Sequence, residues 1–222
     1  MTTVFKQTLC WDGVDYTIPH IFTPETRVEK TICVFGDSFA EAAREATFFK
    51  TKKAWVDKTY FSWMWFLSNF LKAKIYAYGI TAGSEQLTYR TYKESLVLER
   101  DATIIYHTTA ARQDKYDSSL KELSYSQYEE WDRAIKEPCI HLYWGTSLYN
   151  FKSGITLPKT QFHLNYCTDY PTKDWRAWGR EDSIDDSLRD TAINHTNIKG
   201  NLLLALALTS VFKQKFNWST VI

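Results

Sequence analysis

A repeated local pattern constrains the fold of this chain more than any other feature. Three times, a short apolar run is followed by a turn of glycine or small polar residues and then by a stretch that favours a helix; the apolar runs begin at Thr31, Lys74 and Ala102. Successive strand–loop–helix units need crossover connections, which are right-handed in nearly all proteins and produce a parallel sheet. A further apolar run at 139–145 extends the series. The sequence therefore predicts an α/β fold with three layers and a mainly parallel sheet.

The first unit contains the strongest candidate for chemistry, the triplet Gly36-Asp37-Ser38. Residues 32–35 are apolar and typical of a buried strand, and helix formers follow from Phe39. Ser38 is thus expected in a strand-to-helix turn at the carboxyl end of a strand, where open α/β sheets place their active sites. Unpaired N–H groups in the first helical turn favour negative charge beside such a hydroxyl. Ser38 is a candidate nucleophile, and the alternative is that Ser38 or Asp37 only caps the helix.

Charge, cysteine usage and hydropathy give expectations about partners and compartment, although specific binding of nucleic acid or membrane is unsupported rather than excluded. The 222 residues contain 27 Lys and Arg against 26 Asp and Glu, so the net charge of +1 favours neither nucleic acid nor an anionic membrane. The four cysteines lack paired spacing, which favours a reduced compartment. No secretory signal is recognised, and the longest apolar run, 202–208, is too short to span a bilayer. We expect a cytoplasmic or otherwise soluble protein with no membrane span and no nucleic-acid partner.

The domain prediction is a single unit over residues 1–222. Residues 1–30 are expected to form a peripheral arm, with short strands at 4–5 and 16–18, and residues 146–189 to form an aromatic and polar insertion that acts as a lid or substrate wall. We predict helices at 59–71, 85–99, 124–136 and 197–212. The helix at 85–99 should pack Leu87, Tyr92, Leu96 and Val97 on the sheet.

Three motifs in this order resemble the blocks of the SGNH (GDSL) hydrolase family. The serine block is Gly36-Asp37-Ser38, the glycine block is Gly83 or, as a less favoured candidate, Gly79, and the histidine block is His195 before the last helix. The resemblance implies a three-layer α/β/α domain with a flavodoxin-like sheet, Ser38 as nucleophile, His195 as its base and an oxyanion donor at Gly83. The classical α/β-hydrolase elbow is the rival, but its serine normally follows a mid-sheet strand late in the chain.

Two positions depart from the family pattern. The third block usually contains an asparagine that donates to the oxyanion, whereas this chain continues from His107 with small residues; substitute donors are Thr108, Thr109 and Arg112. The family's acid lies three residues before the histidine, where this chain has Ala192. Asp190 is the preferred acid, Asp185 and Asp186 are fallbacks, and a backbone carbonyl could orient the imidazole instead.

The resulting expectation is a serine esterase or acylhydrolase that forms an acyl-enzyme. A small-molecule or glycan ester is the expected substrate, and an O-acyl group on carbohydrate is favoured because the insertion is aromatic but lacks a long apolar lid helix. A catalytically weak or inactive binding module with the same fold is the alternative. No cofactor or metal is expected, because His20, His107, His141 and His163 lack metal spacing and pairs such as Cys139 and His141 are typical of packing. A role for His107 in substrate binding stays open. The aromatic residues of the insertion that support the glycan are Trp144, Tyr149, Trp175 and Trp178.

Overall fold

A six-stranded sheet in the order β3-β5-β4-β6-β7-β8 is the centre of the molecule. The computed structural model describes residues 4–11, 14–37, 40, 62–80, 83–107, 123–143, 157–165, 189–190, 195–196 and 198–221. Five strands are parallel and β3 (His20–Phe22) runs antiparallel to β5. The parallel strands are β4 (Lys30–Gly36), β5 (Ala73–Gly79), β6 (Ala102–His107), β7 (Cys139–Tyr143) and β8 (Gln161–Asn165). Numbered from β4, their order is 2-1-3-4-5, the flavodoxin-like arrangement, which confirms the predicted sheet.

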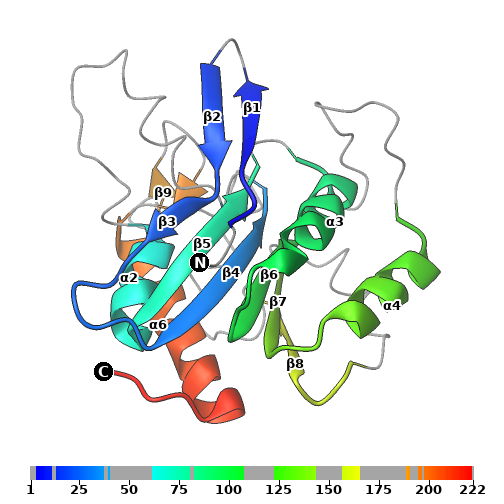
Figure 1. Cartoon of the computed structure of the whole chain (residues 1–222). Helices are drawn as coiled ribbons and strands as arrows, with labels where there is room; N and C mark the ends of the chain where they lie inside the picture. The colour runs from blue at the N-terminus through cyan, green and yellow to red at the C-terminus, as the bar shows by residue number, and fades with distance from the viewer. Residues whose placement is uncertain are drawn as a thin grey trace.

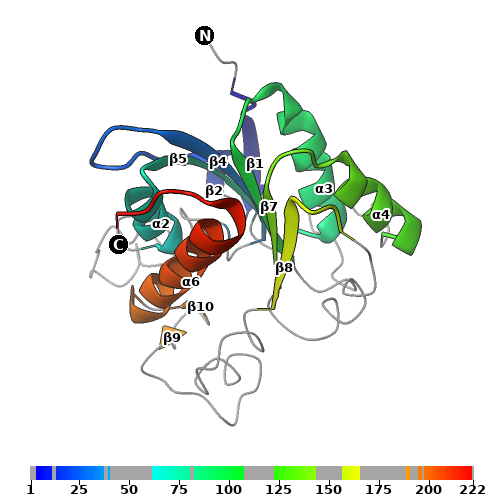
Figure 2. The ribbon, with the colours of Figure 1, turned by 90° about the horizontal axis from the view of Figure 1, so that it is seen from below.

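Helices cover both faces of this sheet and make the three predicted layers. Among the described residues these helices are α2 (Trp63–Leu71), α3 (Glu85–Glu94), α4 (Tyr125–Ala134) and α6 (Ile198–Phe216). Helices α2 and α6 lie on one face, whereas α3 and α4 lie on the other (Figures 1 and 2). A hairpin of β1 (Gln7–Trp11) and β2 (Val14–Ile18) projects beyond the end of the sheet at which β4 and β5 finish (Figure 1).

The two faces of the parallel strands differ in chemistry. Ile32 and Val34 of β4 join the apolar core beneath α2 and α6, whereas Cys33 and Phe35 join the core beneath α3 and α4. Because both faces are covered, the strands have nearly continuous apolar sequences, as buried parallel strands do. The α3/α4 face also contains buried polar side chains from β6, β7 and β8, namely Thr103, His107, His141 and Gln161.

Local caps set where the helices begin and end. The side chain of Ser62 accepts a hydrogen bond from the Trp65 N–H (3.2 Å) at the start of α2, and Ser84 accepts one from the Leu87 N–H (3.2 Å) at the start of α3. Ser124 forms a capping box at the start of α4. Since serine side chains at this position satisfy N–H groups that the helix leaves unpaired, these starts follow directly from the sequence.

Helix α6 runs along the sheet in the direction opposite to β4. Its residues Leu204, Leu208 and Phe212, spaced by four, are buried in the α2/α6 core, and each such burial stabilises the fold by about 1.5–3 kcal/mol. Just past α6, the ring of Trp218 lies 5.6 Å from the Nζ of Lys30, the first residue of β4. Because 19 helical residues span about 28 Å, the amino end of α6 lies toward the carboxyl ends of the strands (Figure 1).

The structure corrects four details of the sequence prediction. Val4 and Phe5 precede the first strand rather than forming it, and the arm is not purely peripheral, because β3 extends the main sheet. The presumed insertion 146–189 contains β8, which pairs with β7. Leu96 and Val97 are 54% and 63% exposed, because α3 ends at Glu94 and a 3-10 turn turns both side chains away from the sheet. The helix predicted from Phe39 lies outside the described residues.

Candidate active site

The end of β4 is tightly packed against the neighbouring strand. The strand ends at Gly36, whose φ of +155° is a conformation that side-chain-bearing residues rarely adopt. A Cβ at Gly36 would lie 2.7 Å from the carbonyl oxygen of Tyr106 on the neighbouring strand β6. Asp37 is buried, and its carbonyl accepts a hydrogen bond from the Ala40 N–H (2.9 Å). Ser38 itself lies outside the described residues.

The loop after β5 lies directly beside the end of β4. Gly79 is paired in register with Gly36, and the N–H of Ile80 donates to the Gly36 carbonyl (2.9 Å). Gly83 follows and precedes the Ser84 cap of α3. The N–H of Gly83 donates to the Ile80 carbonyl (2.9 Å), so it can hold an oxyanion only by sharing its hydrogen between two acceptors.

The third strand of the site, β6, ends level with the other two. Gly36 of β4 is in register with Tyr106, so the loops that follow β4, β5 and β6 leave the sheet at one edge, and that edge is the switch point of a flavodoxin-like sheet. The predicted donors Thr108, Thr109 and Arg112 lie outside the described residues. His107 is buried, and its two ring nitrogens contact Glu85 and His141 (2.9 and 3.0 Å), which leaves neither ring nitrogen for a substrate.

The fourth part of the site is a short hairpin at the start of α6. Strands β9 (Arg189–Asp190) and β10 (His195–Thr196) are antiparallel, and the register places His195 directly opposite Asp190. Helix α6 begins three residues after His195. Because the far end of α6 contacts the first residue of β4, this hairpin lies toward the carboxyl ends of the strands, beside the amino end of α6 (Figure 2). The fallback acids Asp185 and Asp186 lie outside the described residues.

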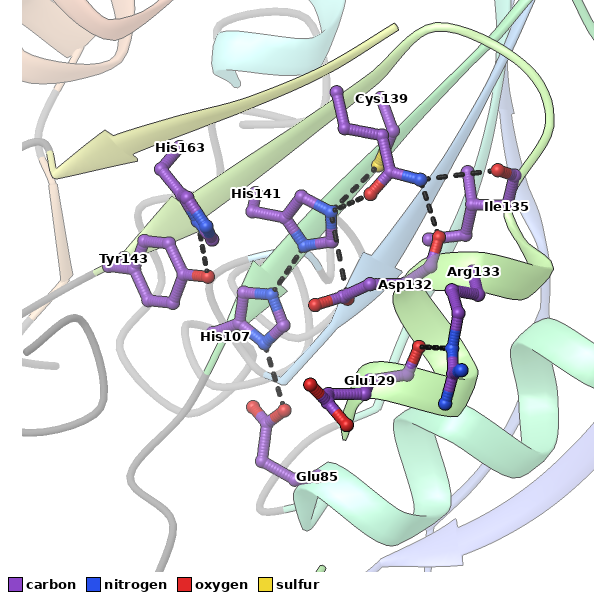
Figure 3. Close-up of polar contacts among 11 residues, drawn as sticks. Glu85, His107, Glu129, Asp132, Arg133, Ile135, Cys139, His141, Tyr143 and His163 are labelled. Carbon is purple, nitrogen blue, oxygen red and sulfur yellow. Dashed lines mark hydrogen bonds and ion pairs between the residues drawn. The ribbon is translucent and has the colours of Figure 1, made fainter. Parts of the chain in front are cut away.

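Beneath this edge, a buried polar network occupies the α3/α4 face (Figure 3). His107 Nδ1 contacts Glu85 Oε2 (2.9 Å), His107 Nε2 contacts His141 Nδ1 (3.0 Å), and His141 Nε2 contacts Gln161 Oε1 (2.9 Å). From the sequence, His107 and His141 are considered only as candidate ligands or packing residues, and Glu85 and Gln161 are not identified as functional residues. The available signal was the placement of polar residues at every second position, as in Cys139, His141 and Tyr143, on strands that are otherwise apolar.

The side chain of Tyr143 packs against the network and stays neutral. The ring of Tyr143 stacks on His107 (centroids 4.6 Å apart, planes 11° apart), and its hydroxyl contacts His163 Nδ1 (2.8 Å). Burial, followed by the negative charges of Asp132 and Glu85, raises the pKa of Tyr143 well above its usual value of 10.0. Tyr143 is therefore a neutral phenol at any physiological pH.

Neither a metal cluster nor a membrane helix is found in the part of the chain that the structure describes. No group of three or more His, Cys, Asp or Glu side chains there is arranged to hold a metal ion. Similarly, each described helix is too short or too polar to cross a bilayer.

Comparisons with known proteins give a match in structure but not in sequence. Neither a family model nor a curated protein matches the chain. Among solved structures, a protein assigned to the G-D-S-L family of lipolytic proteins from Desulfitobacterium hafniense DCB-2 is similar over 82% of this chain and 99% of its own, with a TM-score of 0.51 and 13% identity. The chain has the SGNH-hydrolase fold.

Two further structures of similar size agree with this fold. A carbohydrate esterase family 2 enzyme with its carbohydrate-binding domain from Corynascus thermopiles (Myceliophthora fergusii) matches 93% of this chain and 72% of its own (TM-score 0.52, 12% identity). An α/β-hydrolase enzyme from the metagenome of Lake Arreo, Spain, matches 83% of this chain and 97% of its own (TM-score 0.51, 12% identity). At these identities the likeness establishes the SGNH-hydrolase fold, and the chemistry has to be argued from the residues.

Proposed function

We propose that this protein is a serine esterase that cleaves an O-acyl ester, with Ser38 as nucleophile, His195 as general base and acid, and Asp190 as the residue that orients His195. The turn at Gly36 and the loops after β5 and β6 supply one edge of the site, and the hairpin before α6 supplies the other. The order of these parts along the chain and their common position at the carboxyl edge of the sheet support this assignment.

The register of the β9–β10 hairpin is the observation that carries the proposal. Asp190 lies five residues before His195, two more than the spacing of the family, and that difference is the main objection to Asp190 as the acid. Residues directly opposite each other in an antiparallel pair have Cβ atoms about 4.5–5.5 Å apart. A carboxylate can reach an imidazole nitrogen across that separation, so the backbone register supports Asp190 as the acid despite its spacing.

The mechanism follows the usual division of roles in acyl transfer. His195 accepts the hydroxyl proton of Ser38 as the serine oxygen attacks the acyl carbon, and the same proton is then given to the departing alcohol. Water repeats these steps on the acyl-enzyme, which releases the acid and restores Ser38. The Ser38 N–H and the shared Gly83 N–H would hold the oxyanion, and loss of one such donor typically lowers turnover about 100- to 1000-fold.

Acylated carbohydrate is the substrate class that we favour. One structure of the same fold is described as a carbohydrate esterase of family 2 with a carbohydrate-binding domain. The aromatic residues of this chain that would face a sugar, Trp144, Tyr149, Trp175 and Trp178, lie outside the described residues. Their number in the segment after β7 nevertheless agrees with a surface for a sugar ring, because aromatic faces stack on apolar faces of rings.

One observation favours the alternative of a weak or inactive binding module. The N–H of Gly83 already donates to Ile80, and the asparagine that would supply another donor is absent from the third block. Because one donor is shared and the other is missing, the oxyanion would be stabilised mainly by the Ser38 N–H and by a substitute donor in the loop after β6. Under this alternative the protein binds an acylated ligand without turning it over.

Turnover of a short-chain chromogenic ester tests the proposal. Ser38→Ala should abolish turnover, and Asp190→Asn should lower kcat by a factor on the order of 10³–10⁴. Ser126→Ala is the matched control, because Ser126 is an exposed serine on α4 to which the proposed mechanism assigns no role. A fluorophosphonate should label wild type and the Ser126 variant but not the Ser38 variant. Equal turnover in wild type and Ser38→Ala would reject the esterase proposal.

Comparison of acylated substrates then tests the substrate class. Acetylated xylan oligosaccharides should be deacetylated with a higher kcat/KM than a water-soluble acetate ester that lacks a sugar. Preference for long-chain lipid esters over both would reject the carbohydrate assignment while leaving the esterase proposal intact.

A further inference from the structure

The buried network on the α3/α4 face takes no part in the proposed acyl transfer, although it begins two residues after Gly83 and directly before Thr108. The side chains of Glu85, His107 and His141 are at most 1% exposed. They come from α3, β6 and β7 (Figure 3). The chain of contacts ends at Gln161 on β8. A buried set of ionisable groups is costly unless its hydrogen bonds are satisfied.

Hydrogen-bond geometry fixes how many protons this chain holds. Both amide hydrogens of Gln161 are used, because its Nε2 donates to the carbonyls of Asp132 (2.5 Å) and Ile135 (3.1 Å). Its Oε1 must therefore accept from His141 Nε2–H. One proton must also lie between His141 and His107, and one between His107 and Glu85, because two facing lone pairs at about 3 Å repel each other.

Three hydrogen bonds thus contain three protons, and Glu85, His107 and His141 together carry no net charge. Two kinds of arrangement satisfy this count. In the first, Glu85 is a carboxylate and either His107 or His141 is doubly protonated; in the second, the Glu85 carboxyl is protonated and both histidines are neutral. They differ only in where each proton lies along its hydrogen bond. Removal of one proton would leave a buried negative charge and one unmade hydrogen bond, and addition of one would leave a buried positive charge. The three-proton state is therefore strongly favoured.

The groups that surround the chain reinforce this state. From α4, Asp132 Oδ1 lies 3.8 Å from His141 Nε2, and this carboxylate favours a proton on that nitrogen. From β7, Cys139 Sγ lies 3.7 Å from the same nitrogen, and the neutral phenol of Tyr143 stacks on His107. From β8, the ring of His163 is tilted against that of His141 (centroids 5.4 Å apart).

We infer that Glu85, His107 and His141 form a proton-sharing positioning unit, which holds the loop after β5 and the loop after β6 in fixed relation at the carboxyl edge of the sheet. The unit joins the first turn of α3 to the last residue of β6, and β7 and β8 anchor it from behind. This inference rests on the proposed function for what the two loops bind. None of the three residues is assigned contact with the substrate.

Nuclear magnetic resonance of the wild-type chain tests the proton count without any activity. In protein labelled with ¹⁵N in histidine, the ring nitrogens of His107 and His141 should keep their chemical shifts between about pH 5.5 and 9, whereas an ordinary histidine changes half-way near pH 6.5. His20→Gln, His163→Gln and His195→Gln assign the three remaining histidine signals. Titration of either His107 or His141 with an ordinary midpoint would overturn the inference.

Hydrogen–deuterium exchange tests whether the unit holds the two loops. Glu85→Gln keeps a donor for His107 Nδ1, because an amide N–H replaces the carboxyl O–H, whereas Glu85→Leu keeps bulk but offers no polar group. In E85L, peptides that cover residues 79–85 and 104–112 should exchange about tenfold faster than in wild type, since a buried donor or acceptor is left unmade. E85Q should stay within about threefold of wild type. If E85L does not fold, Glu85→Asp, which shortens the side chain by one methylene, should give the same pattern.

The controls and the ester assay separate this inference from the proposed function. Glu130→Gln, an exposed carboxylate on α4 that is outside the chain of contacts, should leave exchange of both loops unchanged. Unchanged loop exchange in E85L, or an equal increase over the whole protein, would overturn the inference. In ester turnover, E85L should lose kcat with KM little changed, and E85Q should restore it. If wild type shows neither turnover nor fluorophosphonate labelling, the proposed function fails, while the resonance and exchange data still decide the role of the unit.

Discussion

Replacement of Gly36 by alanine should destabilise the protein more than any other single methyl addition discussed for this edge. The added Cβ would lie 2.7 Å from the carbonyl oxygen and 2.8 Å from the Cβ of Tyr106, and 3.0 Å from the Cβ of Ala40. Tyr106 belongs to β6, which is paired on both sides, so it cannot move away without breaking sheet hydrogen bonds. Overpacking of this kind typically costs about 1–3 kcal/mol.

Backbone strain adds to that cost. Gly36 has a φ of +155°, a region that is essentially restricted to glycine, and forcing another residue into it costs about 1–3 kcal/mol. The two effects together predict a loss of about 2–6 kcal/mol in the free energy of unfolding, compared with a total of about 5–15 kcal/mol for a typical domain. A substantial fraction of the variant should therefore unfold at a much lower urea concentration than wild type.

Urea unfolding followed by tryptophan fluorescence measures this loss, and Gly83→Ala is the matched control. At Gly83 the nearest atoms to an added Cβ are the oxygen and Cβ of Ile80, at 3.0 and 3.1 Å, and no positive φ is involved. We expect Gly83→Ala to cost at most about 1–2 kcal/mol. A Gly36→Ala variant within about 1 kcal/mol of wild type, or a Gly83→Ala variant that costs as much, would refute the reasoning.

Three further predictions concern residues away from the proposed site. The guanidinium of Arg100 is buried between the rings of Phe35 and Tyr92 and pairs with Glu137 (3.1 Å). Arg100→Met should therefore lower the free energy of unfolding in urea by about 3–5 kcal/mol, because it leaves the Glu137 carboxylate without its partner. Adding Glu137→Gln should recover part of this loss, and additive losses would contradict the pairing. Burial raises the pKa of the Cys33 thiol from 9.0 to about 12, so the thiol stays protonated and unreactive in the folded protein at pH 8. Iodoacetamide should therefore modify Cys33 only as fast as the protein unfolds. Rapid labelling of the native state would refute this prediction. Burial lowers the pKa of His20 below 6.5, so the unfolded chain binds more protons than the folded chain and stability should fall as the pH drops below about 6.5. His20→Gln should therefore reduce the difference in Tm between pH 7.5 and 5.5. An unchanged difference would reject this role of His20.

Much of the sheet could be predicted from the sequence because its central strands are covered on both sides. Continuous apolar runs identify β4, β5 and β6, and right-handed crossovers leave few orders for them. Strand β8 could not be found in this way, since Gln161 and His163 interrupt its apolar residues. Gln161 is buried there only because it donates to two carbonyls of the α4 region, and that information is not local.

The same distinction applies to the candidate site. Ser38 and His195 stand out because each belongs to a recognisable junction of strand or helix. The sequence alone favours Asp190 only because it could still reach the ring from five residues before His195, and the hairpin register that supports this choice is supplied by the fold. Likewise, Glu85 and His107 are 22 residues apart, and His107 and His141 are 34 apart, so the sheet order alone makes them neighbours.

The unequal chemistry of the two sheet faces has a consequence for how such a protein can change. On the α2/α6 side, the strands present apolar side chains such as Ile32, Val34 and Ile104, where a new polar group would be penalised at once. On the α3/α4 side, the buried carboxyl, imidazole and amide groups can be exchanged for one another in compensating pairs. Directed evolution of altered catalysis should therefore accumulate its remote substitutions beneath α3 and α4, and should leave the opposite half of the interior almost untouched.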